Sequence, residues 1–480
     1  MLERLPVVLL ALTLGLACGG QRARGADGGP TPPANDAATP AEPLPLDPDD
    51  RQALAALAAS LPLHGVMPIK VPGVDDPDDQ WRKLGRKLLD VFAPQSLGRS
   101  DKAQMVAQVR PLAPAIDALV PRHRRYLWLQ DRLRAYAEQA ATAPAPIPET
   151  RYKVRVGTTA PEVGLLRDRL RAEGYGDRNV SDALRNLFDD RLKRAFQAWE
   201  KDHDLPPTVV IDSLTRRRLN EPLTPPIADV ALALARWRML DLRQDAGPQI
   251  FIDMTTYQLV AERDGAVELT MPVVVGKATD KDATPSRTAP LEAVIVNPSW
   301  LVPARIVDEL RPGVHDMPEQ LADKGFEVNV DENGKWKVRM PPGPDNPLGK
   351  LKFQLAGTNG IYLHDTPSRH AFGKADRTLS HGCVRLSQPE ALARWLLPDR
   401  PFDLTNAMAL PTLTQTFNLP KSVPVHFVYQ TIAIASSPEG VDSGRLQRRP
   451  DIYGRDAEAL AAIDAQALAN ALRAVTKRAL

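Results

Sequence analysis

The chain has 480 residues, and at about 150 residues per domain this length predicts roughly three structural units. Hydrophobic residues make up 43% and charged residues 25% of the sequence, values that exclude wholesale disorder, a collagen-like fibre and a polytopic membrane protein. The formal net charge is only +2 and no long run of one sign occurs, so nucleic acid is not an expected partner.

The start of the chain has the features of a targeting segment. An apolar run, Leu5–Ala17, follows Arg4 and is shorter than the roughly 20 residues that a membrane-spanning helix needs, which is typical of a signal peptide. The stretch LGLAC, which ends at Cys18, resembles the lipobox of bacterial lipoproteins, where the cysteine is lipidated and becomes the new N-terminus. We therefore expect residues 1–18 to be a lipoprotein signal peptide. Ordinary secretion and a buried cysteine in a folded helix are the alternatives.

A tether is expected next. Residues 19–50 carry seven prolines and no aromatic residue, so they cannot bury enough apolar surface to offset the entropy of ordering. Gly19 and Gly20 follow Cys18, in place of the Asp that tends to retain lipoproteins at an inner membrane. The lipobox resemblance thus implies a periplasmic protein anchored to the outer membrane through Cys18.

Residues 51–150 are expected to form a helical scaffold domain. Apolar residues recur at steps of three and four, beginning with Leu54, Leu57 and Leu61, which predicts amphipathic helices. Prolines cut this region into short helices, the last of them expected over residues 126–140. A proline-rich linker follows.

Residues 151–222 read as three short helices. The segments LLRDRLRAEGY, FDDRLKRAFQAWEKDHDL and VIDSLTRRRLN, in this order, resemble the small three-helix peptidoglycan-binding domain family. The chain departs from that family at Thr208-Val209-Val210, where such domains usually have Asp-Gly before the Ile-Asp pair. A helical spacer that binds nothing is the alternative. A connecting helix is expected within residues 228–248.

Residues 249–430 are expected to form a β-rich domain. Apolar and polar residues alternate on both sides of Arg263-Asp264-Gly265, which predicts a hairpin. Residues 300–347 are a long excursion rich in proline and glycine, and such excursions are often lids. Residues 431–480 are expected to be a C-terminal extension that ends in one amphipathic helix from Asp456 to Leu480.

One thiol lies beside two candidate bases in this region. Cys383 stands in Ser380-His381-Gly382-Cys383-Val384-Arg385, and His364 lies upstream at the end of an expected strand. A cysteine nucleophile needs an imidazole or a positive field to form the thiolate, and the amides of Gly382 and Cys383 could bind an oxyanion. An inert core cysteine, and a zinc site of His364, His381 and Cys383 that would need a fourth ligand, are the alternatives.

The stretch IYLHDTPSRHAFGKADRTLSHGCVRL resembles the L,D-transpeptidase catalytic domain family, whose signature is His, about 15 residues, then Ser/Thr-His-Gly-Cys. The resemblance implies that Cys383 is the nucleophile, that His364 is the base, oriented by a backbone carbonyl near Asp365, and that His381 lies near the thiol. It also implies oxyanion or substrate roles for a further set: Tyr362, Ser380, Gly382 and Arg385. The expected fold class is α+β multidomain: a helical scaffold, a three-helix peptidoglycan-binding domain, and a β-rich catalytic domain with a lid-like insertion.

The resemblance implies a peptidoglycan L,D-transpeptidase that forms 3-3 cross-links between stem peptides through a cysteine thioester, with no cofactor and no metal. The expected partners are peptidoglycan stem peptides and glycan, and the membrane through a lipid on Cys18. An L,D-carboxypeptidase or exchange enzyme acting on stem tetrapeptides is one alternative. A non-catalytic peptidoglycan-binding lipoprotein is the other.

Overall fold

The computed structural model describes residues 43–480, apart from 96, 140–144, 150–153, 174, 177–179, 222–225, 243–246, 305, 308–320, 331, 333–335, 359, 437–441 and 480. The expected signal peptide, the expected lipidation site Cys18 and most of the expected tether therefore lie outside the described residues. Within the described residues, no helix combines the length and the apolar character that crossing a membrane requires.

The first helices pack around a shared apolar core. They are α1 (Pro48–Ala59), the 3-10 helix η1 (Leu61–His64), α2 (Asp78–Phe92), α3 (Arg99–Gln108) and α4 (Leu112–Asp117). Leucines of α1 and α2 meet here with Trp81 and Phe92, all almost fully buried, as their spacing on one helix face predicts.

The tether was expected to run to residue 50, and this boundary is wrong. Helix α1 begins at Pro48, because Asp47 caps it by accepting a hydrogen bond from the Asp50 amide and proline suits the first helical position. The Asp50 carboxylate is buried and accepts hydrogen bonds from the amides of Leu112 and Ala113, at 2.9 and 2.7 Å. Asp50 thus ties α1 to the start of α4.

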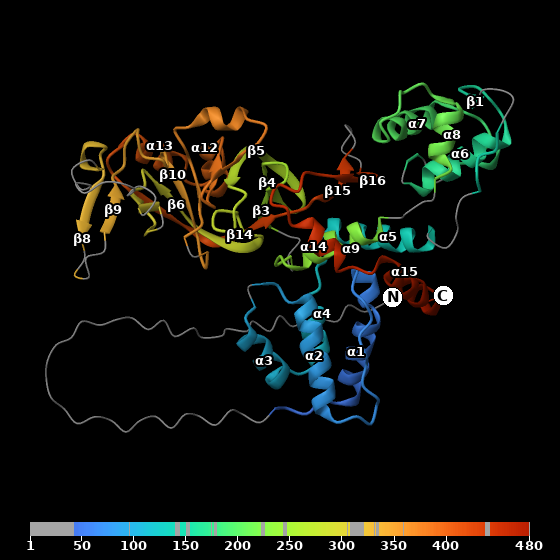
Figure 1. Ribbon diagram of the computed structural model, residues 1–480. Coiled ribbons are helices and arrows are strands. Elements are labelled where there is room, and N and C mark those ends of the chain that lie inside the picture. Colours follow the sequence, from blue (N-terminus) through green and yellow to red (C-terminus); the bar gives the residue numbers. More distant parts are fainter. Residues whose placement is uncertain are drawn as a thin grey trace. The chain divides into compact units, whose positions relative to one another are not determined.

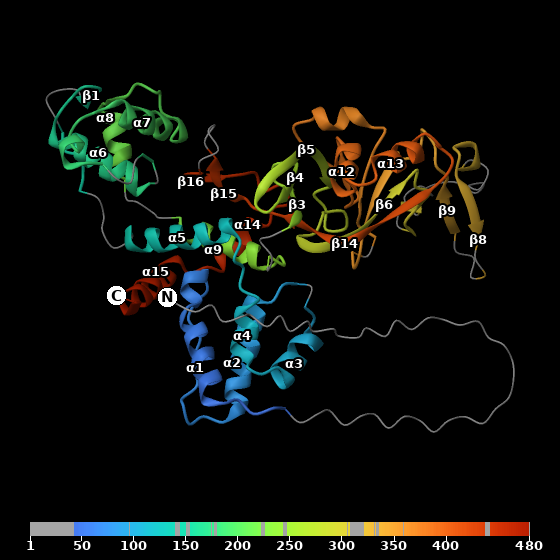
Figure 2. The ribbon, with the colours of Figure 1, turned by 180° about the vertical axis from the view of Figure 1, so that it is seen from behind.

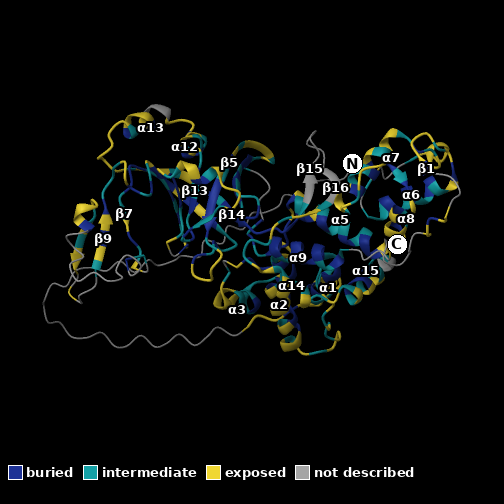
Figure 3. Cartoon of the chain, turned by 45° about the horizontal axis from the view of Figure 1, so that its top comes forward, coloured by how far each residue is buried: buried dark blue, intermediate teal, exposed yellow. Residues whose placement is uncertain are grey.

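A second helical cluster joins the helices to the sheet. Helices α5 (Arg124–Gln139), α9 (Ile227–Arg238) and α15 (Ala465–Ala479) share one apolar core with Phe251, Val428 and Ile432, which come from strands. Nearly every residue of α9 is buried, as its dark colouring shows (Figure 3). Two of its buried charged residues are paired, Arg236 with Asp456 and Asp229 with Arg448, so the helix can lie in the core.

Three further helices form a separate apolar core (Figure 1). They are α6 (Pro161–Ala172), α7 (Asp190–Asp202) and α8 (Ser213–Leu219), accompanied by the 3-10 helix η2 (Asp182–Leu184) and by the paired strands β1 (Val154–Arg155) and β2 (Val210–Ile211). Val209 has a φ of +55°, in the left-handed region that a β-branched residue rarely adopts. The buried Glu200 carboxylate holds it there by accepting the Val209 amide at 3.1 Å.

The β-rich region is a closed sheet. Its strands are β3 (Pro248–Asp253), β4 (Gln258–Arg263), β5 (Ala266–Gly276), β6 (Arg287–Val296), β10 (Leu351–Leu355), β11 (Leu363–His364), β12 (Thr378–Ser380), β13 (Val384–Leu386) and β14 (Gln415–Val428). The order is β12-β5-β13-β11-β10-β6-β14-β3-β4, and β4 also pairs with β5, which closes the sheet. Figure 2 shows the long strand β14 beside β6 and β3. The pairs β3–β14, β11–β13 and β5–β12 are parallel.

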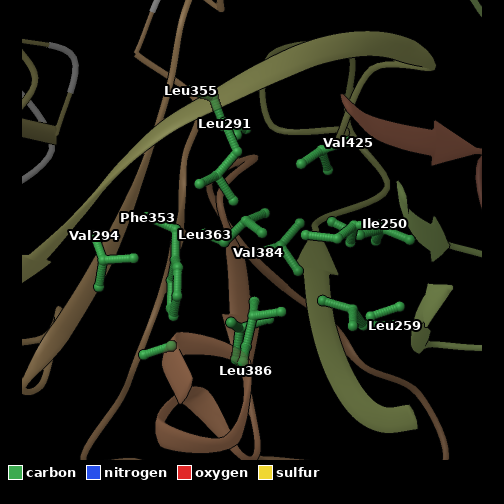
Figure 4. Close-up of a cluster of buried hydrophobic side chains, with 14 of the residues drawn as sticks. Ile250, Leu259, Leu291, Val294, Phe353, Leu355, Leu363, Val384, Leu386 and Val425 are labelled. Carbon is green, nitrogen blue, oxygen red and sulfur yellow. The ribbon is translucent and has the colours of Figure 1, made fainter. Parts of the chain in front are cut away.

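The core of this sheet consists of the inward residues of its strands. Figure 4 shows Ile250, Leu291, Phe353, Leu363 and Val384 converging, and each is fully buried. Because side chains alternate along a strand, the neighbours of these residues point to the opposite face. The 3-10 helix η3 (Arg369–Gly373) and the helices α12 (Pro389–Leu396) and α13 (Pro401–Met408) complete the region.

The expected hairpin forms at the expected turn. Arg263 pairs with Ala266, and Asp264 and Gly265 between them have φ values of +51° and +78°. Two positive φ values in a two-residue loop are typical of the turn that suits strand twist.

The excursion at 300–347 is not a structureless loop where it is described. Its strands β7 (Trp300–Leu301), β9 (Trp336–Met340) and β8 (Glu327–Val330) form a small antiparallel sheet in the order β7-β9-β8. Val302, Val307, Leu321 and Val338 form its own small core.

The C-terminal extension differs from the single helix expected over 456–480. A hairpin of β15 (Ile432–Ser436) and β16 (Asp442–Arg448) precedes two helices, α14 (Asp456–Ala461) and α15. The break occurs because the Asp464 side chain accepts the Ala467 amide at 2.9 Å and so caps a new helix.

Candidate active site

Three polar side chains form a row across neighbouring strands. Lys352 on β10 pairs with His364 on β11, and His364 pairs with Arg385 on β13. Phe353, Leu363 and Val384, the sequence neighbours of these residues, point into the core. The row therefore lies on the opposite face of the sheet.

His364 is held as a neutral imidazole. It is buried, and its Nδ1 lies 2.5 Å from the carbonyl oxygen of Asp365, so Nδ1 carries the proton and donates it to this carbonyl. Burial, and then the positive charge of Arg385, lower the pKa of His364 to about 3. At neutral pH the Nε2 lone pair can accept a proton.

The segment that follows His364 is fixed by a buried carboxylate. Asp365 accepts hydrogen bonds from the amides of Lys350 and Thr366, at 2.8 and 2.7 Å, and pairs with Arg369 at 2.5 Å. Gly349 has a φ of +59°, and a Cβ there would lie 2.3 Å from the Asp365 carboxylate, so the approach requires glycine. The carbonyl that orients His364 is thereby held in place.

The loop that bears Cys383 is closed by Ser380. The buried Ser380 hydroxyl donates to the Cys383 carbonyl at 2.5 Å and accepts the Gly382 amide at 3.1 Å. In this structure the Ser380 hydroxyl and the Gly382 amide therefore bond each other, and their expected oxyanion or substrate roles stay predictions. Both residues shape the loop.

Cationic and phenolic groups surround the thiol. The Cys383 Sγ donates to the Gly360 carbonyl at 3.6 Å. Burial, and then the negative charge of the thiolate, raise the pKa of Tyr362, whose hydroxyl also hydrogen-bonds Cys383. Lys352 Nζ lies 4.4 Å from the centre of the Tyr362 ring. Burial lowers the pKa of Lys352 and of Arg385, and the negative charge of the Cys383 thiolate opposes this lowering. Both cations therefore stabilise the thiolate in return.

His381 occupies a different position. Its Nε2 lies 3.0 Å from the Lys277 ammonium, which can only donate, so the Nε2 lone pair accepts that bond. The Nε2 of His381 is thus engaged with Lys277, and the choice of His364 as the base stays a prediction.

Sequence reasoning missed Lys352 and Lys277. Lys352 alternates with Leu351 and Phe353, which predicts a strand with Lys352 on its outer face. Its position beside His364 depends on the register between two strands, β10 and β11, which the local sequence pattern does not reveal. Among the residues that the structure describes, no three or more His, Cys, Asp or Glu gather as a candidate metal site.

Comparison with known proteins gives a family for this region. Residues 247–404 match the family model of the YkuD L,D-transpeptidase catalytic domain. A curated protein of Haemophilus influenzae, described as a putative L,D-transpeptidase, is 31% identical over 226 residues, which are 43% of this chain and 44% of that protein. The chain thus spans less than half the length of this relative.

Solved structures of L,D-transpeptidases are also similar at low identity. The one from Xylanimonas cellulosilytica is 17% identical, covers 58% of this chain and 99% of its own, and has a TM-score of 0.19. The one from Mycobacterium smegmatis is 19% identical, covers 38% of this chain and 58% of its own, and has a TM-score of 0.20. These TM-scores are too low to support an assignment, which depends on the family model and the curated relative. Residues 247–404, which contain Cys383 and His364, are therefore similar to the L,D-transpeptidase catalytic domain of the YkuD family.

Proposed function

We propose that the chain is a peptidoglycan L,D-transpeptidase that forms 3-3 cross-links through a thioester on Cys383. The observation that carries the proposal is the row of Lys352, His364 and Arg385, in which a neutral buried imidazole stands between two cations that interact electrostatically with Cys383. A cysteine acyltransferase needs these two elements, a proton acceptor and a field that favours the thiolate.

The first half of the reaction is acylation. His364 Nε2 takes the thiol proton, and the Cys383 sulfur attacks the carbonyl carbon that joins the third residue of a donor stem to the D-alanine at position four. The imidazolium then gives its proton to the leaving amine, so the carbon–nitrogen bond breaks, D-alanine departs and a thioester remains. Arg385 and Lys352 stabilise the negative charge before attack.

The second half is resolution of the thioester. An amine on the third residue of a neighbouring stem attacks the thioester, gives a proton to His364, and forms the cross-link as the thiolate leaves. No nucleotide is consumed, because the thioester keeps the free energy of the broken peptide bond. Water in place of the amine would make the protein an L,D-carboxypeptidase, and another small amine would make it an exchange enzyme.

The setting of the enzyme is part of the same proposal. A lipid on Cys18 would anchor the chain to the outer membrane, facing the periplasm, and residues 151–222 would hold it on peptidoglycan glycan. The sequence features that motivate this setting are the apolar run that ends at Cys18 and the order of the helical segments in residues 151–222. The role of residues 300–347 as a lid stays a prediction.

The mass of the products separates the candidate reactions. Purified protein is incubated with a disaccharide-tetrapeptide and the products are analysed by mass spectrometry. A dimer that has lost one D-alanine is expected. A tripeptide monomer as the sole product would assign the hydrolase instead, and unchanged substrate, at a pH where Cys383 is alkylated, would refute both.

A further inference from the structure

A buried threonine lies behind the nucleophile. Thr284 is fully buried, its hydroxyl accepts the Gly276 amide at 2.9 Å, and the same hydroxyl donates to the Gly382 carbonyl at 2.9 Å. The Gly382 carbonyl and the Cys383 amide belong to one planar peptide group and point in opposite directions. By holding the carbonyl, Thr284 therefore sets the direction of the Cys383 N–H.

A tyrosine from the C-terminal extension holds this threonine. The Tyr453 hydroxyl donates to the Gly276 carbonyl at 3.0 Å and accepts the Thr284 amide at 3.3 Å. A Cβ on Gly276 would lie 1.9 Å from the Asp282 carbonyl and 2.7 Å from the Thr284 nitrogen, so the end of β5 and the Thr284 segment are in direct contact. Tyr453 bridges this contact with one hydroxyl.

Tyr453 is itself rigidly placed. Its ring stacks on Tyr429, with centres 5.3 Å apart and planes 9° apart, and its amide donates to the Tyr429 hydroxyl at 2.8 Å. The Arg455 guanidinium lies 4.7 Å from the centre of the Tyr453 ring. Burial raises the pKa of Tyr453, so its hydroxyl keeps the proton that it donates.

Arg236 links this arrangement to helix α9. Its guanidinium lies 4.9 Å from the centre of the Tyr429 ring and pairs with Asp456 at 2.6 Å. Tyr453 lies outside residues 247–404, so the matched family segment does not include it. The nucleophile loop is thus braced by a part of the chain beyond that segment.

We propose that Tyr453 is a positioning residue for the active site: its hydroxyl fixes Thr284, and Thr284 aims the Cys383 amide at the oxyanion that forms during acylation. This inference rests on the proposed function, because it gives the Cys383 amide a part in acyl transfer. Loss of either hydroxyl should therefore slow the acylation of Cys383, which passes through an oxyanion. It should not slow alkylation of the same thiol, because alkylation forms no oxyanion.

The test compares two reactions of one thiol. Acylation is followed with p-nitrophenyl acetate and alkylation with iodoacetamide, each on the full chain, with the Cys383→Ala rate subtracted. Tyr453→Phe removes the hydroxyl and keeps the ring, and Thr284→Val removes the second hydroxyl at equal volume. Thr284→Ser keeps that hydroxyl and removes only a methyl group. The matched control is Tyr175→Phe, which removes a hydroxyl that donates to Asp202 at 2.7 Å in the three-helix core.

Tyr453→Phe and Thr284→Val should each slow acylation about tenfold or more, since a misdirected oxyanion donor costs rate in the transition state. Alkylation should change less than about twofold, as should acylation in Thr284→Ser and Tyr175→Phe. Equal slowing of both reactions in Tyr453→Phe would reveal a merely structural role, and unchanged acylation would leave Tyr453 without influence; either result overturns the inference. Since p-nitrophenyl acetate is not a stem peptide, failure of the proposed function shows separately, as a wild-type chain that is acylated but makes no dimer.

Discussion

Lowering the pH from 7 to 5 should destabilise the folded chain through histidines that are buried in the neutral form. Burial lowers the pKa of His64, His123 and His364 to about 3, and that of His426 to about 4. Unfolding returns each imidazole to water, where its pKa is about 6.5. Below that pH the unfolded chain binds protons that the folded chain does not, so the free energy of unfolding falls as the pH falls.

The expected loss is large. Each of these histidines contributes about 1.4 kcal/mol per pH unit below 6.5, or about 2 kcal/mol at pH 5. Four that unfold together would cost about 8 kcal/mol, a substantial part of the roughly 5–15 kcal/mol that stabilises a typical domain. His203 acts in the opposite sense, because its hydrogen bond to Glu173 raises the pKa of His203; its contribution is present at pH 5 and is lost as the pH rises through that pKa.

Urea unfolding at pH 7, 6 and 5, followed by tryptophan fluorescence, measures this effect. The urea concentration at the midpoint of unfolding should fall steeply between pH 6.5 and 5. His426→Gln is the matched control, since glutamine can hydrogen-bond but cannot titrate. In this variant the free energy of unfolding should depend less on pH, by about 1.4 kcal/mol per pH unit. A midpoint that does not change between pH 7 and pH 5, or a slope that His426→Gln leaves intact, would refute the reasoning.

Other substitutions test single contacts. His364→Ala should slow D-alanine release at least about 100-fold, because the leaving amine loses its proton donor; full activity would remove His364 from the mechanism. Lys352→Met should move the pH profile of Cys383 alkylation up by about one unit, towards the ~8.5 of a free thiol, and an unmoved profile would refute the electrostatic role. Asp50→Ala should lower the free energy of unfolding by about 2–4 kcal/mol in urea titrations, since two buried amides lose their acceptor, and a change within about 0.5 kcal/mol would refute the role of Asp50 in joining α1 to α4. Cys18→Ser should give unprocessed or soluble protein, whereas a mature wild-type chain that begins downstream of Cys18 and fractionates entirely with the soluble periplasm would refute the anchor.

Local patterns predicted local structure well. The two-residue turn at Asp264-Gly265 and the amphipathic helices of the scaffold follow from residue spacing alone, and the structure has both. The signature around Cys383 and His364 predicted the family that residues 247–404 match. These features depend on residues close together in the chain.

Features set by distant contacts were missed. The row of Lys352, His364 and Arg385 depends on strand register. Asp50 was assigned to the tether because the amides that it binds lie 62 and 63 residues further along the chain. The positive φ of Val209 was not predicted, and the replacement of the expected Asp-Gly by Thr208-Val209-Val210 was the one local sign of an unusual loop. The role of Tyr453 has no local sign at all, since its hydroxyl partners lie 169 and 177 residues away.

The central claim is that Cys383 carries the acyl group of the stem peptide. The most direct measurement is the intact mass of the protein after brief incubation with a disaccharide-tetrapeptide, followed by peptide mapping of the adduct. We predict an increase equal to the substrate less one D-alanine, located on Cys383 and lost on addition of an acceptor amine. The Cys383→Ala variant should show no adduct. Cross-linked dimer made equally well by this variant, or an adduct on another residue, would contradict the account.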